Sequence, residues 1–319
     1  MSARTRSLRV IGATGVLAVC AMLAFMTLDA GGRWDFVLPF RGTKLAAMLL
    51  VGYAIAVSTV LFQTITNNRI LTPSTMGFDA LYVLIQTTFV FALGSEAFSS
   101  LDRRIVFLIE AGAMIIFANL LYRMLFSGAV RGLHLILLVG IVFGILFRSL
   151  SNLMQRMIDP TAFVALQDRF FASFNAVDQQ LLGVSALVVL AASVAVWRLR
   201  HVYDVLALGR DAAIGLGVEH RRAVFAILSI VAVLVSISTA LVGPVTFFGL
   251  LVANFAYQMI PSHRHVFVIP AAVLIAFLVL VGGQVILERI FAFDTALSIV
   301  IEFIGGIVFI VLVVRGTAR

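Results

Sequence analysis

Charged residues and cysteine are scarce in this sequence. Of its 319 residues, 62% are hydrophobic and only 12% are charged, which excludes a soluble globular domain and indicates a helical protein that crosses a membrane several times. The single cysteine, Cys20, excludes an intramolecular disulfide and a metal site built from several cysteines. The net charge of +8 requires no nucleic acid, because basic residues at cytoplasmic helix ends set the topology of such proteins.

Lysine is rarer still, since Lys44 is the only one. No G-x-x-x-x-G-K-[ST] loop surrounds it, and a P-loop ATPase needs that lysine on the nucleotide phosphates. No nucleophile–base pair stands out either. His263 and His265 flank Arg264, and without a nearby acid or thiol a basic turn fits these residues better than a metal site. The sequence therefore predicts no catalysis, no metal and no cofactor held by this chain.

Long apolar runs define the architecture. About ten runs approach the roughly 20 residues that a bilayer requires, and they predict an all-α protein with a single transmembrane domain over residues 1–319. The runs lie at 8–28, 44–65, 77–94, 104–125, 132–150, 181–198, 222–242, 246–260, 266–286 and 296–314. The eighth run is short enough to be re-entrant. Five of the six prolines, among them Pro39, fall between runs, and Pro270 is placed in the first turn of its run.

Positive charge predicts the orientation. With the N-terminus inside, 14 of the 23 arginines and lysines lie at cytoplasmic ends: 4, 6, 9, 69, 123, 131, 198, 200, 210, 221, 222, 264, 315 and 319. An even number of spans also returns the C-terminus to the cytoplasm, so we expect both termini inside. On the outer side, Phe163, Leu166, Phe170 and Phe174 recur at helical spacing and predict an amphipathic helix in the membrane interface. This helix could belong to an external docking rim or simply cover the bundle.

The basic stretch 197–222 is the longest clearly water-soluble interruption between two runs. Gly209 is placed to end one short helix, and Asp211 is placed to cap the start of a second. Two short helices joined by a glycine would form a compact projection, here called the knob (residues 203–218). Its arginines place it in the cytoplasm, where it could contact a partner or be an ordinary basic loop.

Three carboxylates, Asp79, Glu110 and Glu302, fall within or near the ends of apolar runs. An acid inside a membrane is costly and suggests function, so one interpretation places them along a translocation pathway with Gln63 and Asn67. The alternative is structural, with the acids hydrogen-bonded inside the bundle to amides such as Gln63, Gln86, Asn119 or Asn254.

Four stretches together resemble one family, the permease subunits of bacterial ABC importers for iron–siderophores, haem and vitamin B12. Residues 67–77 (NNRILTPSTMG) are similar to the family's N-P-L-A-x-P-x-x-L-G turn, and residues 206–218 to its L-A-L-G…L-G-V loop. Residues 243–252 (GPVTFFGLLV) resemble G-P-I-x-F-x-G-L-x-V, and Arg41-Gly-Thr-Lys44 resembles R-L-P-R. The matches occur in order across most of the chain.

The resemblance implies a ten-helix permease in the bacterial inner membrane. Its implied partners are a second permease, two cytoplasmic ATPases that bind the ATP, and an external binding protein. It assigns the knob to ATPase coupling, through Leu206, Leu208, Gly209, Asp211, Gly215, Gly217 and Val218. It assigns Arg41 and Lys44 to docking of the binding protein, and Arg289 joins them by its place after the ninth run. The variant turn at Asn67 favours a siderophore, of catecholate type, and a pair of two different permease chains over a homodimer.

Two departures from the family pattern concern the inner end. The family's P-H-I-A-R segment is replaced by Ala253-Asn-Phe-Ala-Tyr257, and Asn68 replaces the proline of the turn. Two other kinds of function remain open at this point. One is a permease for haem or a cobalamin, and the other is an ion-coupled secondary transporter that uses Asp79, Glu110 and Glu302. A membrane scaffold without transport is disfavoured by the intramembrane acids.

Overall fold

The computed structural model describes residues 3–28, 32, 34–127, 133–175, 177–290 and 297–314. Within these residues the chain forms helices and no strands. Ten helices correspond in order to the ten predicted runs: α1 (Ala3–Thr27), α2 (Trp34–Thr66), α3 (Phe78–Leu93), α5 (Arg103–Ser127), α6 (Leu133–Gln155), α8 (Gln179–Arg198), α11 (His220–Val242), α12 (Phe248–Met259), α13 (His265–Ile290) and α14 (Leu297–Val314). Short helices lie between them: η1 (Pro73–Met76), α4 (Ser95–Ser99), α7 (Pro160–Gln167), η2 (Asp168–Phe170), α9 (Arg200–Leu206) and α10 (Arg210–Gly215).

Helix lengths refine the predicted number of spans. In the described part of the chain, seven helices are long and apolar enough to cross a membrane, while α3 and α14 are shorter apolar helices. Helix α12 has 12 residues and is therefore about 18 Å long at 1.5 Å per residue, less than the roughly 30 Å of a hydrocarbon core. The polytopic all-α architecture is confirmed, and α12 is the short element that the eighth run predicted.

Two predicted proline positions are wrong. Helix α2 begins at Trp34, ten residues before the predicted run, so that Pro39 lies inside it. Pro270 is the sixth residue of α13 and lies beyond the first turn. Both helices extend past their most apolar segment, because a helix end is set by its hydrogen bonds and not by hydropathy. Arg41 and Lys44 therefore lie within α2 and not before it.

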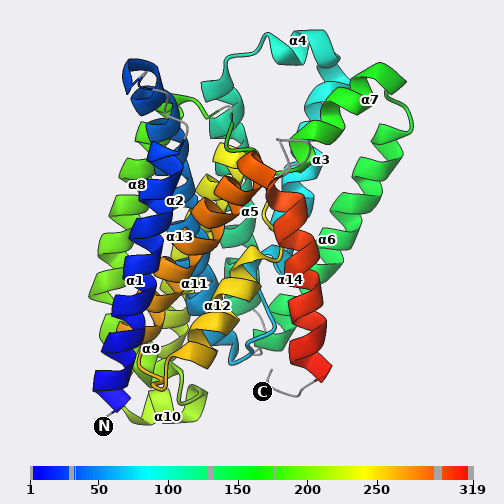
Figure 1. Cartoon of the computed structure of the whole chain (residues 1–319). Coiled ribbons are helices and arrows are strands. Elements are labelled where there is room, and N and C mark those ends of the chain that lie inside the picture. The colour runs from blue at the N-terminus through cyan, green and yellow to red at the C-terminus, as the bar shows by residue number, and fades with distance from the viewer. Residues whose placement is uncertain are drawn as a thin grey trace.

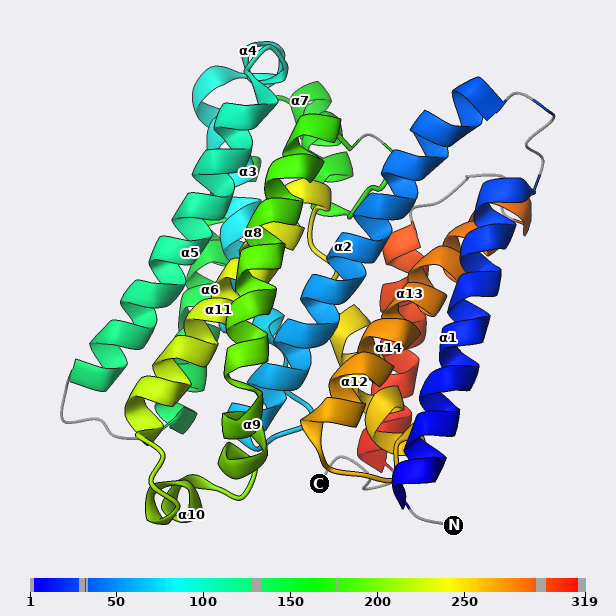
Figure 2. The ribbon, with the colours of Figure 1, turned by 90° about the vertical axis from the view of Figure 1, so that its left-hand side faces the viewer.

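Helix α11 lies at the centre of one half of the bundle, against α2, α5 and α8. Its side chains Val224, Ile227, Val231 and Leu234 are fully buried. In the other half, α13 packs against α1, α2 and α12, as Figures 1 and 2 show from two sides. Helix α2 belongs to both halves and joins them.

Small residues permit the closest helix approach. Gly140 and Gly144 lie one turn apart on α6, and a Cβ at either would come within 3.2 Å of Met76 or Gly77. Gly77 itself has φ +89°, which glycine adopts without steric cost. A small-x-x-x-small face of this kind lets backbones meet where lipid offers no hydrophobic drive for helix association.

The two ends of the molecule differ as the charges predict. The start of α1, the end of α14 and the α9–α10 knob lie at one end, while α4 and α7 lie at the other (Figure 1). The predicted outer helix is shorter than expected, because helical structure ends at Phe170. Leu166 packs in a small cluster with Val90 and Phe98, whereas Phe174 packs with Val242 and Val245 in the main core. The apolar stripe therefore covers the bundle in two places.

Candidate functional site

The knob has the predicted form, two short helices joined at a glycine. Gly209 has φ +95° and Gly217 has φ +83°, both in the region that favours glycine. Helix α9 ends at Leu206 with Ala207 as its C-cap, so the prediction that Gly209 ends this helix is wrong. Gly209 lies beyond that end and is the N-cap of α10, and Asp211 makes no capping hydrogen bond. Asp211 was expected to be the cap and is instead the second residue of α10, where its charge still complements the helix dipole.

The knob exposes three large apolar side chains. Leu208, Ile214 and Leu216 are 65%, 51% and 62% exposed. Three large apolar side chains on a water-facing projection are costly unless a partner covers them. Leu206, a predicted coupling residue, is instead buried at 5% exposure and helps to hold the knob on the bundle.

Polar contacts attach α9 to the bundle. The hydroxyl of Tyr203 donates to the carbonyl of Val196 at 2.9 Å. The carboxylate of Asp204 accepts from the backbone N–H of His265 at 2.9 Å and lies 2.7 Å from Nδ1 of the same residue. The Nε2 atom of His265 lies 2.6 Å from the hydroxyl of Thr64. The sequence suggested only a basic turn around His265, since its partners lie 61 and 201 residues away.

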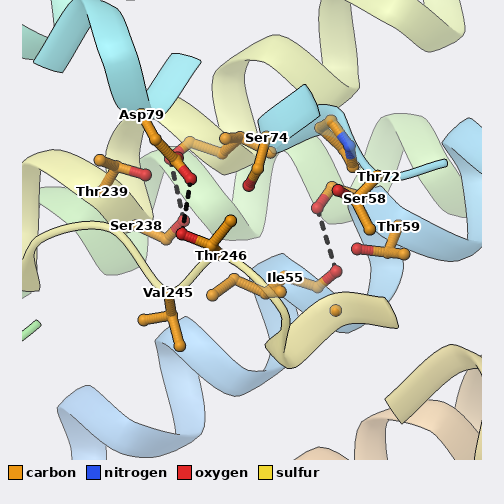
Figure 3. A pocket seen from close by; sticks show the side chains of 13 residues that line it. Ile55, Ser58, Thr59, Thr72, Ser74, Asp79, Ser238, Thr239, Val245 and Thr246 are labelled. Atoms are coloured by element: carbon orange, nitrogen blue, oxygen red, sulfur yellow. Dashed lines mark hydrogen bonds between the residues drawn. The ribbon is translucent and has the colours of Figure 1, made fainter. Parts of the chain in front are cut away.

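A small polar cavity lies inside the bundle beside Asp79. Its volume is about 20 Å³, room for about one water molecule. Hydroxyl groups from several elements line it (Figure 3), namely those of Ser58, Thr59, Thr72, Ser74, Ser238, Thr239 and Thr246. Thr246 donates to Asp79 Oδ2 at 3.1 Å. Of the three predicted acids, Asp79 lines this cavity, and Glu110 and Glu302 do not.

Glu110 lies in a different environment from Asp79. It is 2% exposed and accepts a 2.6 Å hydrogen bond from Gln86, whose amide also contacts the hydroxyl of Tyr82 at 3.0 Å. This is the structural alternative expected for an intramembrane acid, an amide partner inside the bundle. Its place on a pathway stays a prediction.

The turn after α2 is attached to α12 at the knob end of the bundle. The amides of Gln63 and Asn254 both donate to the carbonyl of Arg69, at 2.8 and 3.2 Å. The Arg69 guanidinium lies 4.7 Å from the centre of the Tyr257 ring, a cation–π geometry. Asn67 begins the turn with φ +48°. Of the predicted pathway residues, Gln63 in the last turn of α2 therefore holds the turn that Asn67 begins.

The three predicted docking cations are bound within the chain. Arg41 Nη1 donates to the carbonyls of Phe25 at 3.0 Å and Leu28 at 2.6 Å, and Arg289 also donates to Leu28, at 2.7 Å. These carbonyls lie at the C-terminal end of α1, where cations are favoured. Lys44 is 4% exposed and pairs with Glu288 at 2.7 Å. Arg289 is exposed at the surface, whereas the charge of Lys44 is neutralised inside the protein.

Comparison with known proteins shows the family of this chain. The profile of the FecCD transport family matches residues 8–315. The chain belongs to the FecCD transport family. It is 47% identical over 301 residues to the petrobactin import system permease protein YclO of Bacillus subtilis, covering 94% of this chain and 95% of YclO. It is 37% identical over 278 residues to the petrobactin import system permease protein FatC of Bacillus anthracis, covering 87% and 78%.

Less similar proteins also match over most of the chain. Identity to the ferric enterobactin transport system permease protein FepD of Escherichia coli is 28% over 313 residues, with 96% of this chain and 90% of FepD covered. A solved structure, described as an inward-facing conformation of a metal-chelate type ABC transporter, matches with a TM-score of 0.83 at 18% identity, covering 97% of this chain and 99% of that one. At that identity the match establishes the fold.

The two departures from the family pattern have partners in the structure. Tyr257, which stands where the pattern has arginine, stacks on Arg69 of the facing turn at 4.7 Å. Asn68, which replaces the proline of that turn, accepts a hydrogen bond from the backbone N–H of Ile70 at 2.9 Å.

Proposed function

We propose that this chain is the permease subunit of an ATP-driven importer that moves a ferric siderophore across the bacterial inner (plasma) membrane into the cytoplasm. Membership of the FecCD family carries this proposal, together with the permease names of the YclO and FatC relatives. The chain spans the membrane and hydrolyses no ATP itself. The energy comes from two ATPase subunits that bind the knob.

The exposed apolar knob supports the ATPase contact. Leu208, Ile214 and Leu216 form a small apolar tip that a groove of the partner would remove from water. About 25 cal/mol per Å² of apolar surface is gained on burial, so three such side chains supply a useful share of the binding free energy. A second permease, most simply a different chain, completes the pathway, and an external binding protein delivers the cargo.

The cargo is a ferric siderophore of the kind that the relatives carry. Petrobactin occurs in the names of the relatives at 47% and 37% identity, and enterobactin in the name of FepD. A catecholate-type siderophore therefore remains the preferred cargo, ahead of haem or a cobalamin. The binding protein makes the first selection, so the permease needs only to fit a large anionic or neutral chelate.

Transport assays separate these alternatives. The chain would be reconstituted in liposomes with its genomic partner permease, ATPase and binding protein, and the uptake of ⁵⁵Fe-petrobactin, ⁵⁵Fe-enterobactin and haem would be measured. We expect ATP-dependent uptake of a ferric siderophore and none with a Walker-A lysine variant of the ATPase. Uptake by the permease alone, abolished by a protonophore and by Asp79→Asn, would instead establish the secondary transporter.

A further inference from the structure

The contact between α9 and α13 is a helix cap supplied by another element. His265 is the first residue of α13, and the backbone N–H groups of a first turn have no partner within their own helix. Asp204, in the knob, accepts the His265 N–H at 2.9 Å. A carboxylate at a helix N-terminus is also favoured by the helix dipole. The knob therefore holds the end of a transmembrane helix by a charge-assisted hydrogen bond.

The His265 ring continues this contact to a second transmembrane helix. The carboxylate of Asp204 can only accept, so Nδ1 of His265 carries the proton between them at 2.7 Å. On the opposite edge of the ring, Nε2 lies 2.6 Å from the hydroxyl of Thr64 in α2. His265 is 6% exposed, and its ring lies 5.7 Å from the ring of Tyr203. Asp204, His265 and Thr64 thus form a continuous series of contacts, here called the relay.

The helices that the relay joins are also joined at their other ends. Lys44 of α2 pairs with Glu288 of α13 at 2.7 Å, with both side chains largely buried. Lys44 and Thr64 are 20 residues apart, about 30 Å along a helix. Helices α2 and α13 are therefore joined by polar contacts at two points about 30 Å apart, and packed apolar side chains fill the length between them. Such a pair moves as one body more easily than it bends.

We propose that the Asp204–His265–Thr64 relay positions the knob on the α2–α13 pair and transmits the movement of the ATPase to it. The inference rests on the proposed function, because it assumes that the ATPase binds the knob. Packing alone would let α9 slide on the bundle. Short, directional hydrogen bonds join Asp204 directly to α13, and the His265 ring extends the contact to Thr64 of α2, so that both the distance and the rotation of α9 are fixed. A displacement of the exposed tip of the knob then moves α2 and α13, the two helices that extend to the opposite end of the bundle.

Three substitutions test the relay in the assembled complex. Thr64→Val removes the hydroxyl with little change in volume, and Thr64→Ser is its matched control because it keeps the hydroxyl. His265→Ala removes the ring. Co-purification of the ATPase, basal ATP hydrolysis and siderophore uptake would be measured for each. We expect assembly and basal hydrolysis to persist in all three, while uptake per ATP hydrolysed falls by about tenfold in Thr64→Val and His265→Ala, within the range typical of coupled sites, and stays near the normal value in Thr64→Ser.

A double-mutant cycle tests whether the relay acts as one unit. Asp204→Ala and Thr64→Val remove opposite ends, so if the chain of contacts transmits the movement, the double variant should lose little more coupling than either single one. Unchanged coupling in His265→Ala, or additive losses in the cycle, would overturn the proposal. Loss of ATPase binding in Thr64→Val would also overturn it, since the relay would then only support the fold. A wild-type complex without ATP-driven uptake would refute the proposed function itself, and this inference with it.

Discussion

Lys44 and Glu288 form an ion pair 2.7 Å long between α2 and α13, with exposed fractions of only 4% and 11%. Gln284, one turn before Glu288, donates a further hydrogen bond to the same carboxylate at 2.9 Å. A buried pair with an additional donor holds two helices in one register, because a shift would leave both charges unpaired in a medium of low dielectric. The single lysine of the chain is therefore part of the framework between two membrane-spanning helices.

Breaking this pair should destabilise the permease strongly. Lys44→Met leaves the Glu288 carboxylate buried without its cation, which costs about 3–5 kcal/mol in comparable sites. The double variant Lys44→Met with Glu288→Gln removes both charges and should recover most of the loss. Thermal unfolding in detergent, followed by tryptophan fluorescence, measures the difference. Equal stability of the single and double variants would show that the pair contributes little.

The topology can be tested with two introduced cysteines. Arg210 on the knob and Asp168 after α7 are both exposed, and α10 and α7 lie at opposite ends of the bundle (Figure 2). In a Cys20→Ser background, Arg210→Cys and Asp168→Cys should react with a membrane-impermeant maleimide from opposite sides of sealed vesicles. Labelling of both from the same side would disprove the arrangement with both termini inside.

The knob offers a matched pair of substitutions at one glycine. A Cβ at Gly215 would meet no atom within 4 Å, and the residue has ordinary helical geometry. Gly215→Ala should therefore leave folding and uptake intact, whereas Gly215→Arg should insert and fold normally but abolish uptake and weaken ATPase co-purification, because the long side chain would separate the two surfaces. Normal uptake by a well-expressed Gly215→Arg variant would show that the knob does not couple the permease to the ATPase.

Gly217→Ala tests the backbone conformation of the knob instead, since φ +83° costs about 1–2 kcal/mol for a residue with a Cβ.

The sequence pattern predicted the helices of this protein better than the contacts between their side chains. Each apolar run became a helix, and Gly209 took the backbone conformation that only glycine adopts easily. Asp211 failed as a cap because Gly209 already occupied that position. The partners of His265 and Lys44 lie 61 to 244 residues away, and hydropathy carries no information about such pairs. The sequence singles out the three acids, but only packing reveals that Glu110 meets Gln86 while Asp79 faces a cavity.

Close packing between α2 and α12 gives a prediction about stability. A Cβ on Gly249 would lie 2.2 Å from the hydroxyl oxygen of Thr59 and 3.1 Å from Ile55. Gly249→Ala should therefore force α12 away from α2 or rotate Thr59, at a cost of about 1–3 kcal/mol. Gly282→Ala is the matched control, because a Cβ there would meet no atom within 4 Å and alanine favours the helix. A Gly249→Ala protein as stable as the Gly282→Ala protein would show that the two helices separate without cost.

Docking of the binding protein at the outer end is best tested with substitutions that leave the fold intact. Because Lys44 is buried, its substitution would test stability, and Arg41 and Arg289 are the better probes. Glutamine keeps an N–H donor for the α1 carbonyls and removes the charge, so Arg41→Gln with Arg289→Gln should fold and retain basal ATPase activity of the complex.

Each exposed charge pair contributes up to about 1 kcal/mol. Association of the double variant with the binding protein should therefore slow by up to about tenfold at low salt and much less at high salt, where screening already weakens such pairs. Arg156→Gln, an exposed residue at the same end of the bundle, serves as the control. Association rates measured in nanodiscs that are equal for the wild type and the double variant at low ionic strength would show that these arginines only hold α1.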